Sequence, residues 1–96
     1  MEKNILKNEQ TDALFEALLQ IKDIDQCYAF FEDLCTINEL KSMTQRFEVA
    51  RLLHEGMTFS AISDRTGAST ATITRVNKCL QYGSGYSSVL GEKDSQ

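Results

Sequence analysis

The apolar residues of the chain recur at helical spacing, and polar breaks divide them into segments. A stripe over residues 14–19 predicts a first helix that begins near Thr11, with acidic residues in its first turn, where the helix dipole favours them. A second stripe, spaced i, i+3, i+4, i+7 and i+8 over residues 27–35, predicts a helix from about Asp25. Residues 1–8 are polar and precede both stripes, so we expect a flexible N-terminus.

A third and longer helix is predicted between Thr36 and Gly56. Thr36 forms a capping box with Glu39, and Gly56 suits the left-handed conformation that ends a helix. This helix is apolar on more than one side, which a single chain of 96 residues has difficulty burying. We therefore expect an intertwined homodimer; the alternative is a compact monomeric bundle with this helix at its centre. The large apolar residues expected to drive dimerisation are Phe30, Phe31, Leu34, Phe47 and Leu53.

Composition supports an all-α fold. The chain contains no proline and five glycines, four of them at or after Gly67, which favours uninterrupted helices. No stretch approaches the roughly 20 apolar residues that cross a bilayer, and the N-terminus lacks the apolar segment of a signal peptide. We therefore expect a cytoplasmic protein without a membrane partner. Residues 83–96 are rich in glycine and serine and lack periodicity, so they are expected to form a flexible tail.

The sequence offers little for metal binding or catalysis. Its cysteines, Cys27, Cys35 and Cys79, form no CxxC pair, and His54 is its only histidine. A zinc site needs about four ligands at recognisable spacing. No nucleophile is paired with a base, and no glycine-rich loop is placed to hold a phosphate. We therefore expect no metal, no catalytic residue and no enzymatic activity.

Residues 57–80, MTFSAISDRTGASTATITRVNKCL, predict a helix-turn-helix. A short helix over about Ser60 to Thr66 is followed by Gly67, which tolerates a positive φ, and by a second helix over about Thr70 to Leu80. The inward apolar residues that would lock the two helices together are Ile62, Ala68, Ile73 and Val76.

The second of these helices has a polar face suited to a DNA major groove. Its small Ala71 would allow a close approach to the bases, and Ser69 is a good N-cap whose neighbouring N–H groups could hold a phosphate. The alternative is an ordinary helical hairpin, but threonine is a poor helix former and packing alone does not explain so many. The polar residues of this face are Thr70, Thr72, Thr74, Asn77 and Lys78.

Charge is distributed unevenly along the chain. Residues 1–35 hold three lysines against eight acids, whereas residues 36–82 hold six basic residues against four acids. Arg65, Arg75 and Lys78 lie in a run without any acid and are candidates for phosphate contacts. A local basic patch on an acidic body still attracts DNA, because phosphates respond mainly to charges within about a Debye length, roughly 10 Å. On charge alone, a solvated helix face is the alternative.

The strings TINELKSMTQR and LLHEGMTFSAISDRTGASTATITR resemble the Trp repressor family, and within it the short TrpR-like branch of the YerC/YecD type. The resemblance covers about residues 36–82, and ATITR, from Ala71 to Arg75, is its most specific part. It implies an all-helical, Trp-repressor-like, intertwined homodimer that binds double-stranded DNA as a transcription regulator, more specifically a repressor. Residues 9–82 would form its dimerisation and DNA-binding domain, with the helix-turn-helix at about 58–80.

The same resemblance implies a tryptophan site that this sequence only partly retains. In the family, two arginines sandwich the indole ring, and they match Arg46 and Arg75, while a nearby threonine matches Thr36. The family's glycine after the second arginine is Val76 here, and its side chain would fill the ligand's space. We therefore expect DNA binding without tryptophan as co-repressor and without another cofactor. Arg46 would otherwise form an ion pair with a residue such as Glu39.

Two further departures from the family concern the reading of DNA. One residue is missing near His54 to Met57, which would shift the reading head slightly. Ser60 occupies the position where the family uses an arginine to contact guanine, so we expect a different operator.

A second class of function remains open at this point. The acidic N-terminal third could instead make the protein a non-DNA adaptor for a basic partner. The run from Arg65 to Lys78 discriminates between the two, because a regulator needs it on the outer surface.

Overall fold

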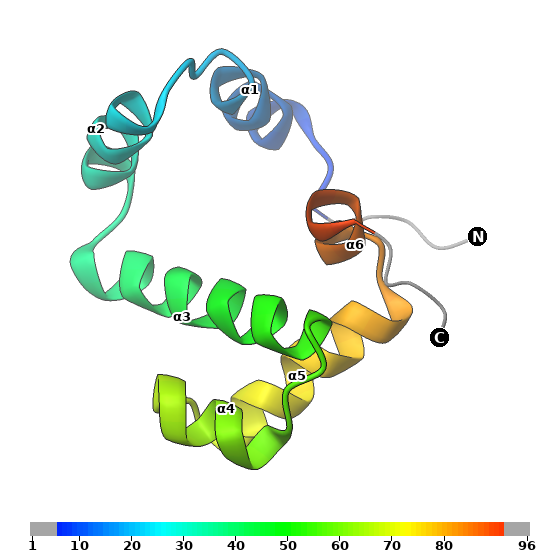
Figure 1. Cartoon of the computed structure of the whole chain (residues 1–96). Helices are drawn as coiled ribbons and strands as arrows, with labels where there is room; N and C mark the ends of the chain where they lie inside the picture. Colours follow the sequence, from blue (N-terminus) through cyan, green and yellow to red (C-terminus); the bar gives the residue numbers. More distant parts are fainter. Residues whose placement is uncertain (1–5, 92–96) are drawn as a thin grey trace. The chain divides into compact units, whose positions relative to one another are not determined.

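The computed structural model describes residues 6–91, and within this range the chain folds into six α-helices (Figure 1). The helices are α1 (Glu9–Leu18), α2 (Ile24–Leu34), α3 (Ile37–His54), α4 (Phe59–Thr66), α5 (Thr70–Tyr82) and α6 (Gly85–Leu90). The contacts divide the chain into two units, one that ends at Thr36 and one that begins at Ile37.

The first unit contains α1 and α2, and each helix is capped by a side chain just before it. The Asn8 side chain accepts a hydrogen bond from the Thr11 amide at 2.8 Å, and the Asp23 side chain accepts one from the Gln26 amide at 2.8 Å. α1 therefore begins two residues before Thr11, and Asn8 is part of its cap rather than of a flexible terminus. The rest of the expected flexible segment lies largely outside the described residues. Neither α1 nor α2 has a buried residue.

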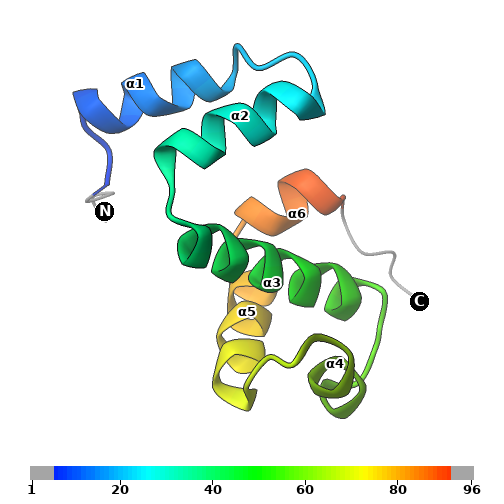
Figure 2. The ribbon, with the colours of Figure 1, turned by 90° about the vertical axis from the view of Figure 1, so that its left-hand side faces the viewer.

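The second unit is built around α3, which contacts α4, α5 and α6. Figure 2 shows α5 crossing α3, with α4 and the first turns of α5 on one side of α3 and α6 on the other. The core lies where these helices meet, and it includes all four inward residues expected for the helix-turn-helix. The buried residues are Val49, Ala50, Leu52, Leu53, Ile62, Ala68, Ile73 and Val76.

The helix ends of this unit follow the local chemistry of the sequence. Gly56 has φ of +95°, its amide donates to the Leu53 carbonyl at 2.9 Å, and the Met57 amide donates to the Leu52 carbonyl at 3.0 Å. This arrangement ends α3 as expected. Gly67 has φ of +75° at the end of α4, again as expected. Because L-residues rarely adopt such values, glycine is required at both turns.

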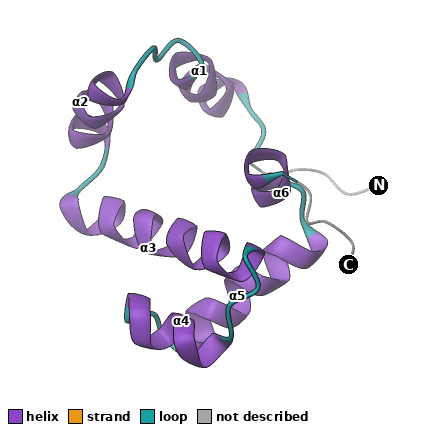
Figure 3. Cartoon of the chain, in the orientation of Figure 1, coloured by secondary structure: helices purple, strands orange, loops and turns teal. Residues whose placement is uncertain are grey.

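The described residues contain helices, turns and loops but no β-strand, so the expected all-α fold is confirmed for this part of the chain (Figure 3). None of the helices between residues 6 and 91 is both long enough and apolar enough to cross a membrane.

The C-terminal segment differs from the expectation of an irregular tail, because residues 85–90 form α6. Tyr86 and Leu90 pack against the core, and the Tyr86 ring lies 6.5 Å from the Phe47 ring, centroid to centroid. His54 Nε2 lies 2.9 Å from the Gly91 carbonyl oxygen, which joins the end of α6 to the end of α3. Tertiary packing therefore stabilises a helix whose glycine and serine content gave no periodic signal. Residues 92–96 lie outside the described range.

We expect the packing of α6 to contribute to stability. Leu90→Ala should lower the free energy of unfolding by about 1–2 kcal/mol, because Leu90 is only partly buried against the core. Val89→Ala is the matched control: its side chain is 71% exposed, and the change should stay within about 0.5 kcal/mol. Chemical unfolding of the two variants, monitored by circular dichroism, measures both values. Equal effects at the two positions would show that α6 does not dock as described.

Candidate nucleic-acid interface

Side-chain hydrogen bonds hold the short turn that joins α4 to α5, the segment predicted to be a helix-turn-helix. The Thr66 hydroxyl donates to the Ile62 carbonyl at 2.8 Å and accepts from the Ala68 amide at 3.1 Å. The Ser63 hydroxyl donates to the Ala68 carbonyl at 3.3 Å. Ser69 caps α5 as predicted, since its hydroxyl accepts from the Thr72 amide at 3.1 Å. Polar groups in the turn are thus satisfied locally, which fixes how α5 leaves the turn.

A second contact from α3 fixes the turn further. Gln45 Nε2 donates to the Thr66 carbonyl at 3.3 Å, joining the middle of α3 to the last residue of α4. Sequence reasoning missed this bond, because the two residues are 21 positions apart and a half-buried glutamine carries no local signal.

α5 presents one continuous outward face. Five side chains on it line a shallow hollow of about 580 Å³, and Thr70 is exposed at the start of the same helix. The spacing is i, i+3, i+4, i+7 and i+8, which places these side chains on one side of a helix. The five are Ala71, Thr74, Arg75, Lys78 and Cys79. Most of the predicted DNA-facing residues of α5 are therefore brought together, and an exposed cysteine joins them.

Two residues expected on this face lie elsewhere. Thr72 is half-buried, and its hydroxyl lies 3.1 Å from the Ser69 hydroxyl, within the helix cap. Asn77 is also half-buried and lines a different hollow, of about 290 Å³, beside His54 and Gly91. Thr72 and Asn77 therefore do not line the hollow with the other residues predicted for this face, since each is next to a core residue of α5 in the sequence. The core residues of α5 are Ile73 and Val76.

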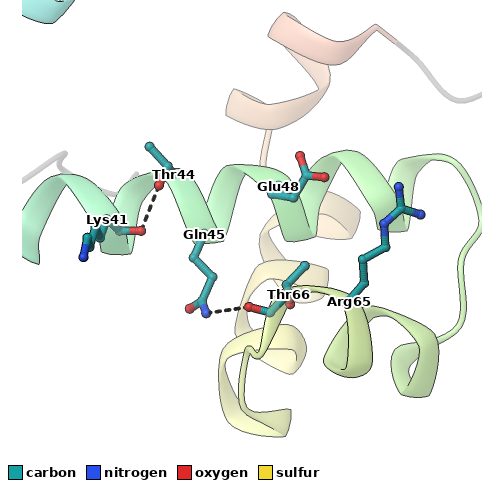
Figure 4. Close-up of a pocket in the computed structure, with 6 residues that line it drawn as sticks. All are labelled: Lys41, Thr44, Gln45, Glu48, Arg65 and Thr66. Carbon is teal, nitrogen blue, oxygen red and sulfur yellow. Dashed lines mark hydrogen bonds between the residues drawn. The ribbon is translucent and has the colours of Figure 1, made fainter.

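The two predicted contact residues of α4 are both exposed but have different surroundings. Ser60 lies in the first turn of α4. Arg65 lines a groove of about 550 Å³ between α3 and α4, and Figure 4 shows its side chain directed from α4 toward Glu48 on α3. The groove is lined by Lys41, Thr44, Gln45, Glu48, Arg65 and Thr66.

Glu48 is an acidic neighbour of Arg65 in space, although the two residues are distant in the sequence. The hydrogen bond from Arg51 holds the pKa of Glu48 below its usual value, and the charges of Arg51 and Arg65 lower it further. Arg51 contacts the carboxylate with two nitrogens, at 3.0 and 2.8 Å, and donates to Glu55 at 2.9 Å. The run from Arg65 to Lys78 contains no acid, but Glu48 on α3 lies near Arg65 in space and would weaken its attraction for a phosphate.

The residues of the implied tryptophan site lie on different elements of the chain. Arg46 is exposed on α3 and Arg75 on α5, and the hollow that contains Arg75 is lined by residues of α5. Val76 is 1% exposed and belongs to the core, so an apolar side chain occupies the position next to Arg75. Thr36 lies in the first unit.

Within residues 6–91, no cluster of three or more histidine, cysteine or acidic side chains is arranged to hold an ion. The cysteines Cys27, Cys35 and Cys79 are all free thiols.

Comparison with known proteins relates the whole helical region to one family. The sequence profile of the Trp repressor protein matches residues 9–94. The uncharacterized protein YerC of Bacillus subtilis (strain 168) is 54% identical over 83 residues, which cover 86% of this chain and 80% of YerC.

Solved structures give the same relationship. A candidate Trp repressor from Staphylococcus aureus superimposes with a TM-score of 0.87 at 41% identity, over 94% of this chain and 95% of that one. A TrpR-like protein from Eubacterium eligens also gives a TM-score of 0.87, at 52% identity, over 97% of this chain and all of the other.

The match begins at the first residue of α1 and extends past the end of α6, so it covers more of the chain than the strings that first suggested it. It confirms the expected Trp-repressor-like fold and the resemblance to the YerC type. The chain belongs to the Trp repressor family, a family of DNA-binding regulators rather than enzymes.

Proposed function

We propose that this protein is a sequence-specific transcription regulator that represses genes by binding double-stranded DNA as a homodimer. The observation that carries the proposal is the outward face of α5, which is exposed, contains Arg75 and Lys78, and has no acidic residue. The protein would act in the bacterial cytoplasm, bound to the nucleoid. Membership in the Trp repressor family supports a regulatory role.

We assign the DNA contacts according to where each side chain lies. Arg75 and Lys78 would bind phosphates. The backbone N–H groups at the start of α5 that do not donate to Ser69 would also bind a phosphate. Thr70, Ala71 and Thr74 would face the bases. Ser60 would contact the duplex from α4, and Arg65 would contribute a weaker phosphate contact. Thr72 would act indirectly, by fixing the cap of α5 with Ser69.

The alternative, an adaptor that binds a basic partner through its acidic N-terminal third, finds less support. The run from Arg65 to Lys78 discriminates between the two functions, because a regulator needs it on the outer surface. Its cationic side chains are exposed in the single chain, as a regulator requires.

Dimerisation is supported by apolar side chains that a single chain leaves in water. Fully burying one such side chain is worth about 1.5–3 kcal/mol, so together they favour association with a second copy. Phe30 and Phe31, which pack edge to face at 5.8 Å, are half-buried, while Leu53 is only 8% exposed and belongs to the core of its own chain. Leu53 is therefore removed from the expected interface. The exposed large apolar residues between Glu9 and His54 are Phe15, Leu19, Ile24, Tyr28, Leu34, Ile37 and Phe47.

We propose that tryptophan is not the co-repressor. Stacking of an arginine on an aromatic ring at an exposed site is worth about 0.5–1 kcal/mol. Inserting a ring against a packed branched side chain costs about 1–3 kcal/mol. Because Val76 is fully packed next to Arg75, the unfavourable contribution is the larger.

The proposed phosphate contacts predict a steep dependence of DNA affinity on salt. A dimer that makes roughly six phosphate contacts should lose about a thousandfold in affinity between 50 and 200 mM salt. Lys78→Ala should weaken binding to all duplexes alike and reduce the salt slope by about one for each contact removed. Lys22→Ala removes the same charge from the first unit and should leave the slope unchanged. Fluorescence anisotropy with a selected duplex measures these slopes, and a flat dependence would contradict the proposed interface.

The exposed apolar side chains predict a dimer of the 10.8 kDa chain at micromolar concentration. Leu19→Ser should raise the dimer dissociation constant at least about tenfold, since Leu19 is 81% exposed in the single chain and would be buried in the dimer. Tyr82→Ser, at a side chain that is 83% exposed on α5, is the control and should leave the dimer intact. Sedimentation equilibrium gives the constants, and a folded, monodisperse wild-type monomer would refute the dimer.

The packing of Val76 predicts no tryptophan binding by the wild type. Since the chain contains no tryptophan, fluorescence of the free amino acid reports binding against a dark background. Val76→Gly should open the space beside Arg75 and allow weak binding, at a cost of about 1 kcal/mol from glycine in a helix interior in addition to the lost packing. Val76→Ala separates the packing loss from the helix effect. A saturable fluorescence change with the wild type, accompanied by tryptophan-dependent DNA binding, would overturn the proposal.

A further inference from the structure

We infer that the reading face of α5 recognises thymine by its 5-methyl group, through the methyl groups of Ala71 and Thr74. The inference rests on the proposed function and specifies which base chemistry that face selects. The inference depends on which side chains of α5 line its outward face and which line the other hollow, beside His54.

Ala71 and Thr74 lie one turn apart on the outward side of α5, and both line the same shallow hollow. Each is exposed and short, so the helix backbone can come close to the floor of a major groove. Each also ends in a methyl group. In the major groove, thymine is the base that presents a methyl group, and apolar contact with alanine or with the threonine methyl is the chemistry that recognises it.

The side chains that would recognise adenine or cytosine are missing from this face. Adenine is recognised by a bidentate asparagine or glutamine, but Asn77 and Gln81 line the other hollow, beside His54. Cytosine is recognised by an acidic acceptor, and α5 contains no aspartate or glutamate between Thr70 and Tyr82.

Two hydroxyls at the helix start, those of Ser69 and Thr72, are also occupied. The Thr72 hydroxyl lies 3.1 Å from the Ser69 hydroxyl, so both belong to the cap of α5. Arg75 and Lys78 line the same hollow as the two methyl groups and supply charge for phosphates or a guanine. Thr70 does not line that hollow, so we assign discrimination of A·T pairs to Ala71 and Thr74.

The competing mode is recognition through the Thr74 hydroxyl, directly or through a bridging water. The two modes differ in which part of the threonine they need. Thr74→Ser keeps the hydroxyl and removes the methyl group, whereas Thr74→Val keeps methyl groups and removes the hydroxyl. Because Thr74 is exposed, both variants should fold, and circular dichroism checks this.

The test uses the full chain and a duplex selected from a random library. Each thymine of the selected site is replaced in turn by deoxyuridine, which lacks only the 5-methyl group. At one or two positions in each half-site, the replacement should weaken wild-type binding about fourfold, the loss expected for one methyl group removed from a buried contact. Replacements elsewhere in the same duplex serve as controls and should change nothing.

The variants assign the effect to residues. Thr74→Val should remain sensitive to deoxyuridine, and Thr74→Ser should lose the sensitivity at one position. Ala71→Gly should lose it at the other position. Sensitivity that survives in Thr74→Ser and disappears in Thr74→Val would overturn the inference in favour of the hydroxyl.

The outcomes separate the inference from the proposed function. If the protein binds a selected duplex tightly and every deoxyuridine replacement is tolerated, thymine-methyl recognition is refuted while DNA binding stands. If no duplex is selected from the library, the proposed function itself fails and the inference fails with it.

Discussion

The contact between α3 and α5 determines what the rest of the molecule can do. Val49 and Leu52 on α3 pack with Ile73 and Val76 on α5, and all four side chains are almost completely buried. Such a contact tolerates little rotation of α5 about its axis, because densely packed side chains interdigitate in one arrangement. The side of α5 that faces α3 is thereby fixed, and so is the side that faces away. The identity of the outward residues is thus a consequence of the core, and a change in core packing would alter which residues reach a ligand.

Features that depend on local chemistry were predictable from the sequence. The caps at Ser69 and Gly67 and the end of α3 at Gly56 follow from residue types that favour particular backbone conformations. Features that depend on tertiary geometry were not predictable. Asn77 is polar and at a plausible spacing, yet it turns toward α6, and Arg65 meets Glu48 from a different helix. The helix α6 was missed for the same reason, because its stability comes from the surface it covers.

Position 76 links the core of the chain to the proposed loss of the tryptophan site. Val76 contributes to the core that orients α5, and a glycine at that position would contribute no side chain to it. The residue therefore helps to fix the orientation of α5. Under the proposed function, this side chain would hold α5 in place without a bound small molecule.

The first unit of the chain has a consequence for gene control. α1 and α2 bury no residue of their own, so the proposed second copy would supply the surface that covers them. Folding and association would then depend on each other, and stability would rise with protomer concentration. Below the dimer dissociation constant, operator occupancy would vary with the square of the amount of protein. While most operators are unoccupied, a twofold change in regulator level would change occupancy fourfold, which gives a steeper response without any effector.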